Sequence, residues 1–225
     1  MASSIIHYAI SKKILETISI HNADRFLLGA SIAPDASSHE DGSYDKSHFW
    51  ERFVYEQLTG INWDNFVKEY REDFWKDDVY LGYYCHLIQD AVWFHDIVDK
   101  YIRIYPKDIK ELKHQMGYRD YKRLNYLLIK EYNLLPFENV NLQIPIKEIT
   151  EARIIKSFET FEQWFQAEKC TKTDLELYSW DIIDDYINKS VSVCVSQIEA
   201  LKNGVKGSDP KDYYVLKLEY KPLHK

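Results

Sequence analysis

The stretch Asp78–Tyr101, DVYLGYYCHLIQDAVWFHDIVDKY, decides how the rest of the chain must be arranged. It contains no proline, and its apolar residues recur at helical spacing along its whole length, so it predicts one long helix. At about 100° per residue, His86 and Asp90 lie at the edge of its apolar arc, whereas Gln89 and Asp96 fall on the polar side. A carboxylate buried in an apolar arc is costly unless it is paired or bound to a metal. The His86–Asp90 pair therefore requires a chemical explanation.

The composition favours a helical protein with a substantial core. The chain has 225 residues, of which 45% are hydrophobic and 15% aromatic, and its seven glycines and six prolines are too few for an all-β sandwich. We expect an all-α, multi-helix single domain over residues 1–204. Residues 205–225 form a C-terminal tail whose alternating pattern, DYYVLKLEYKPL, is typical of a short strand.

Charge and hydropathy exclude several classes of partner. The net charge of −7 disfavours nonspecific nucleic-acid binding, although bound cations in a nuclease reverse the local sign. No segment has the roughly eighteen consecutive apolar residues of a membrane span. The first twenty residues include Lys12 and Lys13 and lack the apolar core of a signal peptide, and the three cysteines lack metal-ligand spacing. We therefore expect a cytoplasmic protein with reduced thiols.

Periodicity and capping residues predict the remaining helices. The first begins at Ser3 or Ser4, and the second is capped by Asp24 and ends before Pro34. The others are expected at residues 49–58, 62–76, 106–132 with a break near Gly117, 149–167 and 174–201, with an extended connector at 134–146.

A polar loop, DASSHEDGSYDKSH at residues 35–48, lies between apolar segments and includes Asp35 and His48. Alone, such a loop is typical of a solvated surface. Together with the buried pair four residues apart on one helix, it predicts a metal site, because histidine nitrogens and carboxylate oxygens are zinc ligands. Asp90 is suited to bridge a second ion.

Two alternatives compete with this hypothesis. His95-Asp96 resembles the doublet that names the HD phosphohydrolases, and that site would use His48, His95, Asp96 and Asp184. A straight helix, however, turns His95 about 180° away from His86, so the two pairs cannot reach one metal. The other alternative is a non-catalytic helical binding protein that retains part of a metal site.

The order of several short motifs resembles the zinc-dependent phospholipase C family, which shares its all-α fold with the S1/P1 nucleases. These motifs are His7, Leu28-Gly-Ala-Ser-Ile-Ala-Pro-Asp35, Ser47-His48-Phe49 and Gly82-Tyr-Tyr-Cys-His86-Leu-Ile-Gln-Asp90-Ala-Val-Trp93. The resemblance covers roughly the first hundred residues. It implies a metal-dependent phosphoesterase that uses activated water on a small phosphate ester or a phospholipid headgroup.

The resemblance also implies ligands. His48, His86 and Asp90 would bind one zinc, Asp35 would be a ligand or the general base, and His7 would join Asp90 on a neighbouring zinc. The family's N-terminal amine ligand has no evident counterpart, because six residues precede His7.

The family's third zinc site is altered in this chain. Asp96 occupies the position of its histidine, with His95 one residue early, and His114 and Asp120 are the remaining substitutes. We therefore expect one or two zinc ions, or another divalent transition metal, rather than three.

Overall fold

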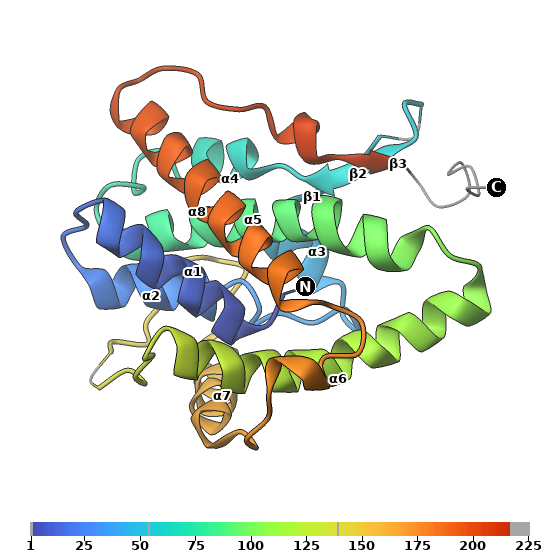
Figure 1. Ribbon diagram of the computed structural model, residues 1–225. Helices are drawn as coiled ribbons and strands as arrows, with labels where there is room; N and C mark the ends of the chain where they lie inside the picture. Colours follow the sequence, from blue (N-terminus) through green and yellow to red (C-terminus); the bar gives the residue numbers. More distant parts are fainter. Residues whose placement is uncertain (1, 54, 139, 217–225) are drawn as a thin grey trace.

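Helix α5 (Asp78–Trp93) runs through the middle of the computed structural model, and the other elements pack around it (Figure 1). The structure describes residues 2–53, 55–138 and 140–216. The surrounding helices are α1 (Ser4–Thr17), α2 (Ala23–Ser31), α3 (Ser43–Ser47), α4 (Trp63–Glu69), α6 (Lys107–Glu131), α7 (Glu151–Gln163) and α8 (Trp180–Lys202). This architecture confirms the expected all-α class, with one small sheet added.

The central helix continues beyond Trp93 with a different winding. Residues Phe94–Arg103 form a π-helix (η1) rather than the last turns of one straight α-helix. A π-helix closes its hydrogen bonds over five residues, so a wheel drawn at 100° per residue does not hold beyond Trp93. The wheel is also wrong about Gln89, which is fully buried because α1, α2, α4 and α8 all pack against α5.

Helices α2 and α5 touch through their backbones where Gly29 and Gly82 cross. A methyl group on Gly82 would lie 2.0 Å from the Phe26 carbonyl oxygen, and one on Gly29 would lie 2.2 Å from that of Val79. Only glycine at both positions permits this approach. The crossing brings the C-terminal end of α2, and the loop that follows it, against the middle of α5.

Residues 49–53 and 55–58 are not helical, contrary to the prediction of a helix over 49–58. Strands β1 (Trp50–Phe53) and β2 (Leu58–Ile61) form an antiparallel hairpin in which Trp50 pairs with Ile61. Phe49 and Gln57 adopt positive φ angles of 50° and 58°, which end any helix at both sides of β1. Aromatic residues such as Trp50 and Phe53 favour strands when a neighbouring strand is available, and local periodicity does not report that neighbour.

The tail contributes a third strand. Val215–Leu216 (β3) pairs antiparallel with β2, so the sheet order is β1-β2-β3. The rest of the expected strand, residues 217–225, lies outside the described residues.

Several helix boundaries also differ from expectation, and α4 ends at Glu69 rather than at residue 76. Asn22, not Asp24, caps α2, because its side-chain oxygen accepts a hydrogen bond from the Arg25 backbone N–H. Helix α6 passes through Gly117 without a break. Helix α8 begins at Trp180 behind the cap Ser179, later than expected. No helix in the part of the chain that the structure describes has the length and apolar character needed to cross a bilayer.

We predict that Gly82→Ala destabilises the protein by about 2 kcal/mol or more, because overpacking at a backbone contact forces the helices apart. Gly117→Ala is the matched control, since its new methyl group would meet only side chains, the nearest at 3.1 Å. Urea unfolding of both variants measures the difference. Equal stability of the two variants would contradict the tight crossing.

Candidate metal centre

Four side chains from separate parts of the chain converge beside the middle of α5. Asp35 follows α2, His48 follows α3, and His86 and Asp90 project from adjacent turns of α5. One potential ligand atom from each residue lies within 4.8 Å of all the others. The two histidines are fully buried and Asp90 is almost so, whereas Asp35 is partly exposed. Residues that are up to 55 positions apart in the sequence therefore lie next to one another in the structure.

The four histidine-to-carboxylate distances are close to those expected around one four-coordinate metal ion. His48 Nε2 lies 3.5 Å from Asp35 Oδ1 and 3.4 Å from Asp90 Oδ2. His86 Nε2 lies 3.7 Å and 3.6 Å from the same two oxygens. Zinc bonds of roughly 2.0–2.2 Å at tetrahedral angles separate neighbouring ligands by about 3.3–3.6 Å. Direct charge-assisted hydrogen bonds would be shorter, about 2.7–2.9 Å.

The hydrogen bonds made by the rings of His48 and His86 use Nδ1 and leave Nε2 available in both residues. His86 Nδ1 bonds to the Ala30 carbonyl oxygen at 3.0 Å, and His48 Nδ1 lies 3.1 Å from that of Tyr44. A carbonyl oxygen accepts only, so Nδ1 of each ring carries a hydrogen, and Nε2 is the nitrogen that can bind a metal once any proton on it is released. Both Nε2 atoms, Asp35 Oδ1 and Asp90 Oδ2 are buried without a hydrogen-bond partner among the described residues. Four such atoms facing one another indicate a site built for a cation.

The electrostatics also require positive charge at this point. Burial opposes ionisation of Asp35 and Asp90, yet the neighbouring histidines hold the pKa of both carboxyl groups below its usual value. Burial lowers the pKa of His86, but Asp35 and Asp90 outweigh it and raise that pKa to about 10. The two buried carboxylates thus draw a proton onto His86, and a metal cation would neutralise them in the same way.

His7 lies on the other side of Asp90. Its Nε2 is 3.3 Å from Asp90 Oδ1, and its ring stacks on that of His86. Gln89 orients the ring, because Gln89 Oε1 lies 2.8 Å from His7 Nδ1. Burial, then the nearby His86, lowers the pKa of His7, which keeps the ring neutral. The Ala2 backbone N–H also reaches Asp90 Oδ1, at 3.4 Å.

Tyr44 closes another side of the centre. Its ring stacks on His48 at a centroid distance of 3.8 Å. Burial, and then the charges of Asp90 and Asp35, raise the pKa of its hydroxyl far above the usual value. The hydroxyl therefore stays protonated and can donate a hydrogen bond to an anion at the centre.

The His95–Asp96 doublet is not part of this group. His95 Nδ1 lies 3.0 Å from Asp96 Oδ1, and the Asp96 carboxylate also pairs with Lys100 and Lys189. Asp184 accepts hydrogen bonds from Tyr132 and Asn188 instead. The structure therefore does not bring the HD-type residues together.

His114 and Asp120, the substitutes for a third metal site, also lie elsewhere. Asp120 is buried, but its carboxylate accepts hydrogen bonds from the backbone N–H groups of Glu176, Leu177 and Tyr178. These bonds fix the segment before α8. His114 lies on α6, and burial lowers its pKa. Neither residue belongs to a cluster of metal-ligating side chains in the described chain.

The family model described as zinc dependent phospholipase C matches residues 6–190. The chain belongs to this family. Searches among curated proteins and among solved structures gave no significant match. Membership in the family and the four-residue centre together support a metal-dependent, phospholipase C-like hydrolase.

Sequence reasoning missed the residues that orient the ligands in this member of the family. The helical wheel places Gln89 on the polar face, but the residue is fully buried because helices enclose α5 on all sides. Its position next to Asp90 was the one signal in the sequence that it lies near the centre. Ser47 is buried beneath the loop, where its hydroxyl contacts the Pro34 carbonyl oxygen and His48 Nδ1. Tyr83 on α5 donates a hydrogen bond to the Ser47 carbonyl oxygen at 2.7 Å. These contacts anchor the polar loop against α5.

We predict that zinc binding at pH 7.5 releases about one proton from His86, because its raised pKa of about 10 keeps the ring protonated and a ligand must be neutral. His7, whose pKa is lowered, contributes none. Titration calorimetry in buffers of different ionisation enthalpy measures the release. A binding enthalpy independent of the buffer would contradict the prediction.

Proposed function

We propose that this protein is a zinc-dependent phosphoesterase that hydrolyses a phosphate ester with water. The observation that carries the proposal is the close approach of four buried ligand atoms without hydrogen-bond partners among the described residues, in a member of a zinc-dependent phospholipase C family. Phosphoester or lipid substrates are implied by the family. A non-catalytic protein that retains a metal site would present the same four atoms, so hydrolysis of a phosphate ester is the measurement that separates the two functions.

Each residue has a distinct role in this proposal. His48, His86 and Asp90 hold the metal through Nε2, Nε2 and Oδ2. When bound, zinc polarises the phosphoryl oxygens and lowers the pKa of water. Asp35 holds the metal through Oδ1 and lines the cleft above the centre, so its carboxylate can also accept the proton of the attacking water. Tyr44 packs against the His48 ring, and its protonated hydroxyl faces Asp90.

Asp90 is placed to bridge two ions. Its Oδ2 faces His48 and His86, while its Oδ1 faces His7. The first side has four potential protein ligands, whereas among the described residues the second has His7 and Asp90. We propose that one ion is held tightly and a second ion weakly, since affinity rises with the number of protein ligands.

We predict that Asp90→Asn abolishes zinc retention and lowers the hydrolysis of bis(p-nitrophenyl) phosphate about a hundredfold or more. The matched control is Asp96→Asn, which removes a carboxylate from the same continuous helix but outside the centre. Elemental analysis and the release of p-nitrophenol provide the two measurements. Metal loss in Asp96→Asn, with retention in Asp90→Asn, would overturn the assignment.

We also predict that His7→Gln retains one zinc per chain but loses the weaker ion, whereas His86→Gln loses both. The physical reason is that His7 Nε2 faces Oδ1 of Asp90, whereas His48 and His86 face its Oδ2. Zinc titration followed by chelator competition measures the two affinities. Loss of the tighter ion in His7→Gln would contradict the division into two unequal sites.

A further inference from the structure

A cleft of about 600 Å³ opens directly above the centre, with Asp35 on its wall. Its sides come from α6 and α7, and the start of α1 and the loop after α2 complete it. Asp35 is the member of the four-residue group that is partly exposed, because it faces this cleft. A phosphate ester bound at the centre must therefore place its remaining atoms here.

The charged side chains along this cleft are mostly cationic. Lys122 on α6 and Arg153 and Lys156 on α7 line it, and Asp35 is the only carboxylate among its described lining residues. Arg153 is neutralised by Asp41 and also donates to the Ser43 hydroxyl. Lys122 and Lys156 form no ion pair with any described carboxylate. Two lysines are thus free to bind an anion next to the centre.

The neutral part of the lining adds hydrogen-bond donors and aromatic surface. Asn125 on α6 is fully buried, and its Oδ1 accepts a hydrogen bond from the Ser3 hydroxyl. Its Nδ2 has no hydrogen-bond partner in the described chain, which is costly unless a ligand supplies an acceptor. The ring of Trp164 lies on the α7 side of the cleft.

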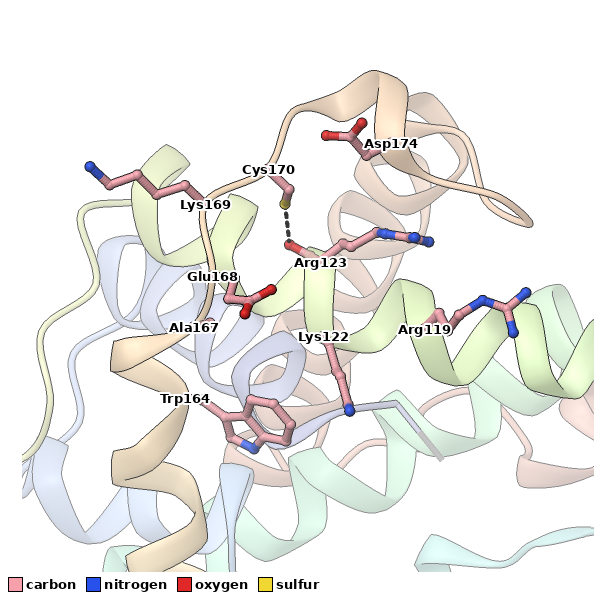
Figure 2. A pocket seen from close by; sticks show the side chains of 9 residues that line it. All are labelled: Arg119, Lys122, Arg123, Trp164, Ala167, Glu168, Lys169, Cys170 and Asp174. Carbon is pink, nitrogen blue, oxygen red and sulfur yellow. Dashed lines mark hydrogen bonds between the residues drawn. The ribbon is translucent and has the colours of Figure 1, made fainter.

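A second hollow of about 570 Å³ lies next to the cleft and shares two lining residues with it, Lys122 and Trp164. Figure 2 shows the Lys122 side chain extending from α6 beside Trp164 at one edge of this second hollow. Arg119 and Arg123 lie along the same helix, and Glu176 pairs with both. Lys122 is therefore the unpaired cation at the junction of the two hollows.

We propose that this cleft selects phosphate esters that carry a second anionic group, such as a further phosphate, and that Lys122 and Lys156 determine this specificity. The inference rests on the proposed function, because it places the scissile phosphate at the metal centre. Lys122 and Lys156 bind the second anion, Asn125 Nδ2 donates to it or to a neighbouring oxygen, and Trp164 packs against the body of the ester.

The overall charge of the protein makes this arrangement informative. The chain carries 36 acidic and 29 basic residues, so an average surface hollow is expected to be acidic. Moreover, Asp35 and Asp90 would repel an anionic substrate in the absence of compensating charge. Unpaired lysines at this place reverse the local potential and attract the same substrate.

The experiment compares two matched pairs of substrates with the zinc-loaded protein. The lipid pair is short-chain phosphatidylinositol and its 4-phosphate, and the nucleotide pair is thymidine 5′-(p-nitrophenyl phosphate) without and with a 3′-phosphate. We expect the member with the additional phosphate to have a higher kcat/KM by about tenfold or more. The pair that is hydrolysed identifies the source of the ester.

The variant Lys122→Glu/Lys156→Glu should remove or invert this preference, and it should lower the kcat/KM of bis(p-nitrophenyl) phosphate less than that of the ester with the additional phosphate. The matched control is Lys68→Glu/Lys202→Glu, which changes the same net charge at exposed positions outside both hollows. A preference that is absent, or that persists in Lys122→Glu/Lys156→Glu, overturns the inference.

Failure of the proposed function would be seen separately, as no hydrolysis of any ester by the zinc-loaded protein. In that case, titration calorimetry with inositol 1-phosphate and inositol 1,4-bisphosphate decides the specificity of the cleft. Tighter binding of the bisphosphate that is lost in Lys122→Glu/Lys156→Glu supports the inference, and equal binding of both compounds overturns it.

Discussion

The burial of the Asp90 carboxylate inside the most enclosed helix is the constraint on which this structure depends. An ionised carboxylate in such surroundings is strongly destabilising unless positive charge and hydrogen bonds surround it. Three histidines, His7, His48 and His86, surround this carboxylate, and the Nε2 atom of each lies within 3.6 Å of an Asp90 oxygen. Asp35 adds a second negative charge, so a proton alone is a poor match and a divalent cation a good one.

The close crossing of α2 and α5 gives this arrangement its precision. Because Gly29 and Gly82 lack side chains, the two backbones touch, and the Ala30 carbonyl oxygen comes within 3.0 Å of His86 Nδ1. The chain then leaves α2 and reaches Asp35 after only four more residues, which limits where that carboxylate can lie. The helix crossing therefore limits the position of Asp35 and, through the Ala30 carbonyl oxygen, orients the ring of His86.

The sequence was sufficient to predict the helical class and the pairing of His86 with Asp90, because both follow from the 3.6-residue period of a helix. Asp35 and His48 were reachable only through the order of motifs, since a polar loop alone is typical of solvent exposure. The hairpin at Trp50–Ile61 and the π-helix after Trp93 were not predictable, because each depends on partners distant in sequence or on a change in winding. The role of Gln89 was hidden for the same reason: a wheel assumes one exposed face, and α5 has none.

Negative charge lies at the buried centre and positive charge lies in the cleft, a separation that the net charge of the chain does not indicate. The buried centre holds two carboxylates that could bind a cation, whereas the cleft beside it carries unpaired lysines. A substrate with one phosphate would interact mainly with the centre, and a second anionic group would also meet the lysines. Lys122 and Lys156 lie on exposed helix surfaces, so they can change without disturbing the buried residues of the centre. The same centre can therefore be combined with clefts that prefer different substrates.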